Sequence, residues 1–292
     1  YTHQPFNKLS STATASYVYD SNGNLQSKSD STGTTLYVWD YENRLKQVIK
    51  PNGLTINYKY DALGRRSERS LSSGTWTRFT YDGQDVIKDT NSDGTTVSYL
   101  NGQGIDNKLK RVVGGQAQYF LKDHLGSTKA LTDSTGAVIA SANYDSFGNS
   151  TNNLNTRYQY TGREFDAETG LYYYRARWYD AQLGRFISED PIGFDGGDIN
   201  LYGYVRNNAP NFRDPSGNIP VVIPIVIGVG ILIAASPSPV NAPGPGDPVY
   251  YPDNPLIINA AGGPICSFVL KRFAGPLINR LLSGTGDDII EL

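Results

Sequence analysis

Two copies of the phrase Asp-Pro-x-Gly are the residues with the clearest potential for chemistry. They are Asp190-Pro191-Ile192-Gly193 and Asp214-Pro215-Ser216-Gly217. Two carboxyl groups held close together cannot both ionise, so one can serve as an acid while the other activates a water molecule. The same phrase also suits an ordinary type I turn, with Asp first, Pro second and Gly fourth. The residues alone leave an acid–base pair and a pair of turns both open.

The sequence contains few residues that could form other kinds of site. Cys266 is the single cysteine, which excludes an internal disulfide framework and a multi-cysteine metal site. The two histidines are His3 and His124, and His124 lies within a turn phrase, where we expect a structural role. The formal net charge is −2 and no basic run occurs, so we expect no nucleic-acid partner. We expect neither a cofactor nor a metal ion.

An internal repeat must position the two aspartates. Its clearest copies are Tyr17-Val18-Tyr19-Asp20, Tyr37-Val38-Trp39-Asp40, Tyr58-Lys59-Tyr60-Asp61 and Phe79-Thr80-Tyr81-Asp82. Gly23, Asn43 or Gly64 follows three residues after the aspartate, where a tight turn accepts a left-handed backbone. A second turn lies halfway along each unit, for example at Asn52-Gly53. Two turns per unit and alternating apolar residues predict two strands per repeat.

The predicted fold is therefore all-β. Successive hairpins form a curved or spiral antiparallel sheet of the β-shell type, because one hairpin cannot bury its own apolar face and needs neighbours. Helix is expected only in short pieces, above all in an apolar, partly helical C-terminal tail. The repeated Tyr and Asp are interpreted as scaffold. The chain lacks methionine and opens within a repeat at Tyr1, so we expect a processed piece or a fragment.

The chain resembles the RHS/YD-repeat family, which includes bacterial Rhs toxins, the C components of insecticidal toxin complexes, and animal teneurins. The resemblance covers roughly residues 15–217. Its most specific part is similar to the RHS-repeat-associated core, with Tyr172-Tyr173-Tyr174-Arg175-Ala176-Arg177-Trp178-Tyr179-Asp180 and Gly184-Arg185-Phe186 before the first Asp-Pro-x-Gly. We divide the chain into repeats (1–156), core (157–217) and a tail (218–292).

The resemblance implies that the core is an autoprotease. Asp190 and Asp214 would be its catalytic pair, and the cut would fall just after the second motif, at Asn218 and Ile219. Arg185 is the cation expected near the pair, with Arg213 and Arg206 as weaker candidates. Asn218 stands where the family usually has a large apolar residue, and the gap between the motifs is slightly longer than in cleaving members.

The tail changes composition at Asn218. Residues 219–235, from Ile219 to Ala235, carry no charge and fit either a membrane segment or a buried plug or interface. Residues 236–255 read as a Pro/Gly/Ser linker, and residues 267–282 as a short interrupted helix.

The function expected from the sequence is a secreted or cell-surface YD-repeat shell or scaffold, with self-cleavage left open. An alternative is an Rhs-type toxin end with an encapsulated membrane-active or partner-binding tail. A carbohydrate-binding adhesin is the third. The expected partners are upstream repeats of the same protein or further copies of it, with membrane or partner contact through residues 219–235.

Overall fold

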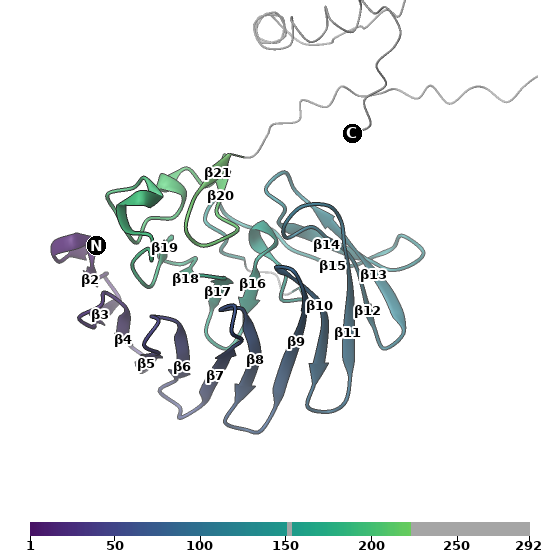
Figure 1. Ribbon diagram of the computed structural model, residues 1–292, viewed down its shortest axis with the longest axis horizontal. Coiled ribbons are helices and arrows are strands. Elements are labelled where there is room, and N and C mark those ends of the chain that lie inside the picture. Colours follow the sequence, from purple (N-terminus) through teal and green to yellow (C-terminus); the bar gives the residue numbers. More distant parts are fainter. Residues whose placement is uncertain (151–153, 223–292) are drawn as a thin grey trace, which may run out of the picture. The chain divides into compact units, whose positions relative to one another are not determined.

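The repeats fold into one long antiparallel sheet, as predicted. The computed structural model describes residues 1–150 and 154–222. Its main sheet has fifteen strands that pair in the order of the sequence, and it curves around a hollow (Figure 1). The strands are β1 (Thr2–His3), β2 (Leu9–Ser11), β3 (Ala15–Tyr19), β4 (Leu25–Asp30), β5 (Gly33–Trp39), β6 (Leu45–Ile49), β7 (Thr55–Tyr60), β8 (Arg66–Leu71), β9 (Trp76–Asp82), β10 (Asp85–Asn91), β11 (Thr96–Asn101), β12 (Lys108–Val113), β13 (Gln116–Lys122), β14 (Thr128–Thr132) and β15 (Val138–Ser141).

The repeated aspartate closes the turn of its own repeat. Oδ1 of Asp40 accepts hydrogen bonds from the backbone N–H groups of Glu42 and Arg44, both at 2.9 Å. The residue three positions after the aspartate has positive φ, +77° at Gly23 and +58° at Asn43. The same pair of bonds recurs at Asp20, Asp61, Asp123 and Asp145. The spacing of the aspartates in the sequence is thus the spacing of these turns.

The aromatic residue before the aspartate ties each repeat to the preceding one. Its ring N–H or hydroxyl donates to a backbone carbonyl about fifteen positions earlier in the chain. The bonds run from Trp39 to Leu25 (2.7 Å), from Tyr60 to Leu45 (2.8 Å), from Tyr81 to Arg66 (2.8 Å) and from Tyr144 to Thr128 (3.0 Å). The apolar ring is partly buried while its polar end is satisfied, which lets neighbouring repeats stack without unpaired groups.

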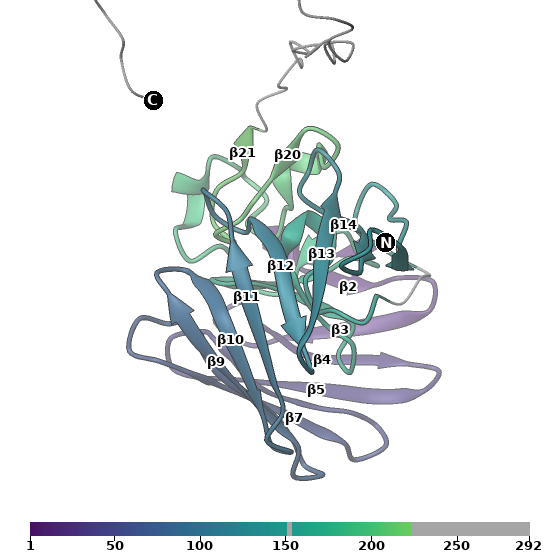
Figure 2. The same cartoon turned by 90° about the vertical axis from the view of Figure 1, so that its right-hand side faces the viewer.

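A second, smaller sheet lies within the hollow of the first (Figures 1 and 2). Its four strands are β16 (Glu164–Asp166), β17 (Leu171–Tyr174), β18 (Arg177–Asp180) and β19 (Arg185–Phe186). A short pair follows, formed by β20 (Phe212–Arg213) and β21 (Val221–Val222). Four 3₁₀ helices complete the described part: η1 (Pro5–Asn7), η2 (Tyr160–Gly162), η3 (Gly193–Gly196) and η4 (Val205–Asn207).

Apolar packing joins the two sheets. Tyr17, Tyr37 and Tyr58, from successive repeats, are buried in one cluster with Tyr173 and Trp178 of the small sheet. The rings of Tyr58 and Trp178 have centroids 4.5 Å apart. The first tyrosine of each phrase is therefore a core residue, which agrees with its interpretation as scaffold.

Buried ion pairs cross the same interface. Glu164 of β16 accepts from Arg66 of β8 at 2.6 Å and from Arg157 at 2.8 Å. Arg157 also pairs with Asp89 of β10. Because charges removed from water need close partners, these residues fix how the small sheet sits against the large one.

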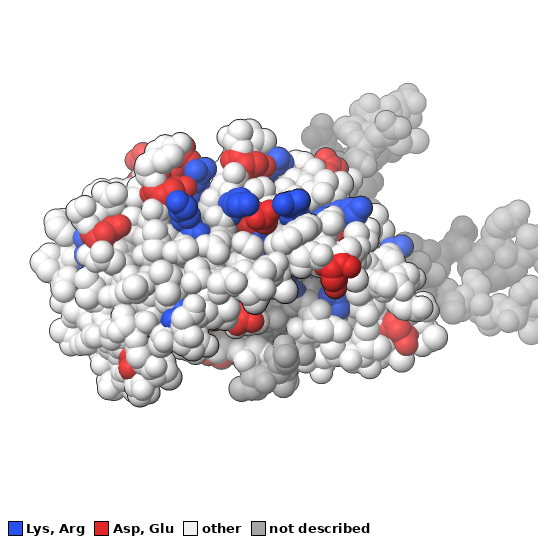
Figure 3. All heavy atoms as spheres, turned by 90° about the horizontal axis from the view of Figure 1, so that it is seen from below, with Lys and Arg blue, Asp and Glu red and all other residues white. Residues whose placement is uncertain are grey.

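Charged side chains on the outside are mixed in sign. The face seen in Figure 3 carries a band in which Lys or Arg and Asp or Glu are interspersed, and most of the rest is uncharged. Within residues 1–150 and 154–222, no helix has the length and apolar character needed to span a membrane. The linker and the helix expected in residues 236–282, and the apolar run beyond Val222, lie outside the described residues.

We expect the Glu164→Gln variant to lose about 3 kcal/mol or more of unfolding free energy, because two buried arginines lose their countercharge. Burial raises the pKa of Glu164, but Arg157, Arg66 and Arg163 outweigh burial and hold that pKa well below its ordinary value. This stabilisation is present above the pKa of the unfolded state and is lost as pH falls toward the folded-state pKa.

Urea denaturation at several pH values measures both effects. Glu42→Gln is the control, because Glu42 pairs with Arg44 at 2.5 Å but its side chain is 46% exposed. It should change stability by about 1 kcal/mol at most. Equal losses in the two variants would contradict the role given to Glu164.

Candidate functional site

The two Asp-Pro-x-Gly phrases form turns, and one oxygen of each aspartate serves its turn. Oδ1 of Asp190 accepts from the N–H of Ile192 at 3.1 Å. Oδ1 of Asp214 accepts from the N–H groups of Gly217 (2.9 Å) and Asn218 (3.1 Å). The turn interpretation of both phrases therefore accounts for Oδ1 of each aspartate but not for Oδ2.

The other oxygens of both aspartates point at one cation, Arg177. Its Nη2 lies 2.8 Å from Oδ2 of Asp190 and 3.5 Å from Oδ2 of Asp214. All three side chains are at least 93% buried. The guanidinium also lies over the ring of Phe186, 3.7 Å from its centroid. The two aspartates, 24 positions apart in the sequence, thus share one buried partner.

Arg185, the cation expected near the pair, lies elsewhere, and that expectation is corrected. Arg185 donates to the backbone carbonyl of Asn7 at 2.5 Å and covers the ring of Tyr202. The reason is the register of the β18–β19 hairpin. Arg185 pairs with Asp180 at the closed end, whereas Arg177 is at the open end, where the chain leaves toward Asp190.

Arg206 and Arg213, the weaker candidates for the cation near the pair, do not take the place of Arg185. Within the described ranges, no ion pair joins Arg206 or Arg213 to either aspartate. Arg206 does line a cavity next to Asp190. Arg177 belongs to the Arg175-Ala176-Arg177 phrase, and its role could have been inferred by pairing β17 with β18 across a two-residue turn.

The backbone of the second turn rests against the β17–β18 turn. Three consecutive residues donate to three consecutive carbonyls: Arg175 to Pro215, the N–H of Ala176 to Ser216 at 3.1 Å, and Nε of Arg177 to Gly217. Gly217 has φ +76°, and a Cβ there would collide with the carbonyl oxygen of Tyr174. Glycine is therefore required for this close approach. The three carbonyls that precede Asn218, those of residues 215–217, are therefore all held by hydrogen bonds from residues 175–177.

Asp190 and the carbonyl of Asn218 meet at a small cavity. Its volume is about 10 Å³, which is about the space of one water molecule. Arg177, Asp190 and Asn218 are among its lining residues. A Cβ built on Gly196 would lie 3.0 Å from Oδ2 of Asp190 and 3.2 Å from the carbonyl oxygen of Asn218. The missing side chain of Gly196 thus leaves a space that both the carboxylate and the peptide carbonyl border.

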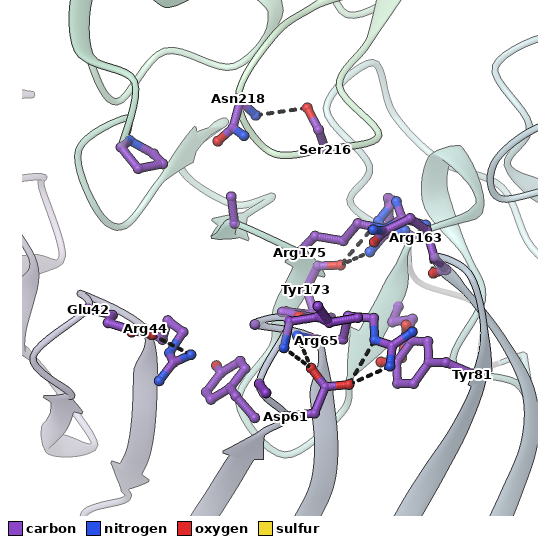
Figure 4. Close-up of a pocket in the computed structure, with 18 of the residues that line it drawn as sticks. Glu42, Arg44, Asp61, Arg65, Tyr81, Arg163, Tyr173, Arg175, Ser216 and Asn218 are labelled. Atoms are coloured by element: carbon purple, nitrogen blue, oxygen red, sulfur yellow. Dashed lines mark hydrogen bonds and ion pairs between the residues drawn. The ribbon is translucent and has the colours of Figure 1, made fainter.

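Asn218 also lines a much larger cavity. Its volume is about 940 Å³, and it opens between the small sheet and the turns of the large one (Figure 4). Ser216 and Asn218 belong to its wall, together with the Arg65–Asp61 pair of a repeat turn and with Arg175. Within residues 1–150 and 154–222, no group of three or more His, Cys, Asp or Glu side chains could hold a metal ion.

The electrostatics distinguish Asp190 from an ordinary surface aspartate. Burial raises its pKa, and the charge of Asp214 adds to the rise, while Arg177 and the N–H of Ile192 oppose it. The balance leaves the pKa above its ordinary value. Burial also lowers the pKa of Arg177, although both aspartates act against that shift. Asp190 is thus suited to take up and release a proton.

We expect the titration of Asp190 to follow this balance. In the protein with ¹³C-labelled aspartate carboxyls, NMR should find the midpoint of Asp190 above the ordinary range. Asp214→Asn should lower that midpoint, because it removes the negative charge that raises it. Asp195→Asn, at an exposed position of η3, is the control and should leave it unchanged. A midpoint that does not respond to Asp214→Asn would contradict this coupling.

Comparison with known proteins finds the repeats and the core together. The family model described as teneurin YD-shell matches residues 2–210. The tRNA nuclease WapA of Bacillus subtilis (strain 168) is 35% identical over 226 residues, which are 73% of this chain and 9% of that protein. The probable deoxyribonuclease RhsB of Dickeya dadantii (strain 3937) is 31% identical over 193 residues, 61% of this chain and 13% of that protein.

Solved structures show the same fold. The structure of TcdB2-TccC3-Cdc42 has a TM-score of 0.53 at 24% identity, over 70% of this chain and 13% of that one. TcdB2-TccC3 without its hypervariable C-terminal region gives 0.52 at 23% identity, with the same coverage. TccC3 is also part of a solved structure of the Photorhabdus luminescens Tc holotoxin pore, with a TM-score of 0.50 at 22% identity over 71% of this chain and 13% of that one. The chain spans a small part of each protein that it resembles.

Proposed function

We propose that this chain, which belongs to the teneurin YD-shell family, is part of a larger secreted or cell-surface shell and cuts its own backbone between Asn218 and Ile219. One observation carries the proposal. The Asn218 carbonyl and the Asp190 carboxylate flank the same small cavity, and Arg177 is in its wall. The nuclease names belong to the relatives. In this chain the matched residues form the shell and its core.

The proposed reaction is hydrolysis by one water molecule in the small cavity. Asp190, as carboxylate, takes a proton from the water while the water oxygen attacks the carbonyl carbon of Asn218. The C–N bond then breaks, and the proton passes to the nitrogen of Ile219. The products are a carboxylic acid at Asn218 and an amine at Ile219, and transfer of the acid's proton to the amine leaves a carboxylate and an ammonium group. No separate substrate cleft is required, because the fold itself holds the peptide beside the acid.

Asp214 and Arg177 have supporting parts in this reaction. Asp214 is absent from the wall of the small cavity, and its Oδ1 binds the N–H groups of Gly217 and Asn218. It therefore orients the peptide and helps to raise the pKa of Asp190. Arg177 fixes the carbonyl of Gly217 and offsets the charge of both aspartates. Asp190 is the group that acts on the water.

The test is the mass of the folded protein measured under denaturing conditions. We expect two pieces, one that ends at Asn218 and one that begins at Ile219. Asp190→Asn should slow the cut by about a hundredfold or more, since the base is lost while the turn is kept. Asp195→Asn is the matched control and should be cut at the wild-type rate. A wild-type chain that stays whole after folding would contradict the proposed self-cleavage.

For assembly, we propose pairing through the ends of the large sheet. Within the described residues, β1 and β15 are each paired on one side only. Val138 and Ile139 on β15 are 61% and 43% exposed, which makes this edge a template for another strand. The proposed partner is a repeat of the same protein, because such a strand continues the sheet in register.

We expect Ile139→Lys to weaken self-association, since a charge on an edge strand discourages pairing. Sedimentation over a range of concentrations measures it. Val18→Lys is the control, because Val18 is 52% exposed but lies on β3, which is paired on both sides. A similar loss of association in both variants would place the contact on the sheet face instead of the edge.

A second candidate function is that of the C-terminal end of a toxin, in which the membrane-active or partner-binding piece is the tail that follows the cut. The large cavity supports it, because its wall includes Ser216 and Asn218, next to the proposed cleavage point. The tail beyond Val222 lies outside the described residues. The two functions share the cut and differ in what the released piece does.

A further inference from the structure

Arg175 has a strained backbone and an unusual set of partners. It is the first residue of the two-residue turn between β17 and β18, and its φ is +62°. Glycine or asparagine is usual at such a position, because a side chain crowds the backbone there. A residue with a long side chain persists in this conformation only where its surroundings hold it. The partners of the guanidinium show what holds it.

The guanidinium of Arg175 joins three separate segments. It binds Asp106 with two hydrogen bonds, Nη1 to Oδ2 at 3.1 Å and Nη2 to Oδ1 at 2.8 Å. Nη2 also donates to the carbonyl of Gln84 at 3.3 Å, and Nη1 donates to the carbonyl of Pro215. Asp106 and Gln84 belong to the β11–β12 loop and the β9–β10 turn of the large sheet. Pro215 belongs to the second Asp-Pro-x-Gly turn.

Asp106 is held just as firmly. Its φ is also +62°, and its side chain is 3% exposed. Besides Arg175, it accepts from Nη1 of Arg163 at 2.6 Å. Burial raises the pKa of Asp106, but Arg163 and Arg175 outweigh burial and leave the pKa below its ordinary value. A charged carboxylate from the sheet is thus seated between two arginines of the core.

We propose that Asp106 and Arg175 are positioning residues that make the cut depend on the docking of β9–β12 onto the core. The inference rests on the proposed self-cleavage. When the β11–β12 loop docks, Asp106 orients Arg175, which then holds the Pro215 carbonyl. Ala176 and Arg177 hold the next two carbonyls, and Asn218 is set beside Asp190. Without the sheet loop, the turn loses one of these three anchors.

A comparison pair in the same molecule separates positioning from stability. Asp166 of β16 is also buried, and Arg69 of β8 binds it with two hydrogen bonds, at 2.8 and 2.9 Å. This pair likewise joins the core to the sheet. The hydroxyl of Tyr58 also donates to Asp166, at 2.8 Å, and within the described residues Asp166 makes no hydrogen bond or ion pair with residues 214–218. Loss of Asp166 should therefore weaken the fold without disturbing the turn.

The experiment compares Asp106→Asn with Asp166→Asn in the full chain. Chains made by cell-free translation are shifted to buffers of different pH, and the cut is followed by gel and by mass. We expect both variants to lose stability to urea. Asp106→Asn alone should slow the cut, at least tenfold, with the pH midpoint unchanged because Asp190 keeps its neighbours. Slowing of both variants in proportion to their lost stability would overturn the positioning role.

Chemical rescue tests Arg175 directly and serves even if Asp106→Asn fails to fold. Arg175→Ala should be cut slowly, and guanidinium at concentrations well below those that unfold the protein should restore the rate. Urea at equal concentration should not. Absence of rescue, or a wild-type rate in Arg175→Ala, would overturn the inference while the self-cleavage stands. A wild-type chain that is never cut would overturn both.

Discussion

Buried charge pairs set the relation between the repeat sheet and the core, and the site depends on that relation. Glu164 and Asp166 of β16 are bound by Arg66 and Arg69 of β8, which lie 98 and 97 positions earlier in the sequence. Arg157 joins Glu164 to Asp89 of β10. An apolar interface alone would tolerate small shifts between two sheets, because apolar contact has little directionality. Charges buried in pairs do not tolerate such shifts, since a lost partner leaves a charge without water. The turn that carries Asp214 is built on strands fixed in this way.

The two aspartates use their oxygens for different purposes. In each, Oδ1 completes a turn, as it does in the repeats at Asp40, while Oδ2 faces Arg177. The site can therefore be understood as a repeat turn whose second oxygen has been directed inward. This division also explains why asparagine is an informative replacement. An asparagine side chain can still accept from the backbone N–H groups, but it brings no charge to Arg177.

The sequence predicts local structure well and long-range partners poorly. Aspartates about 21 residues apart predicted the hairpins, because each aspartate builds its own turn from residues two and four positions on. The convergence of Asp190 and Asp214 followed from the resemblance. The cation did not, because Arg185 and Arg177 differ only in which end of one hairpin they occupy. Asp106 lies 69 positions before Arg175, and no local pattern links the two residues. Such contacts depend on how two sheets dock, and this is decided by the whole interface.

The size of the small cavity bears on what the site can do. Asn218 lines both a space for about one water molecule and a cavity of about 940 Å³. The Asp190 side offers room for about one water molecule but none for a second peptide, so the proposed hydrolysis would be confined to the protein's own chain. The carbonyls of residues 215–217 are already held by residues 175–177, so the peptide at Asn218 needs little rearrangement before the proposed attack. A reaction that happens once per molecule requires no route for product release through the small cavity. Hydrogen bonds that hold a peptide this firmly would hinder a protease that must bind and release many substrates. They do not hinder the proposed reaction, which is a single cut within the same molecule.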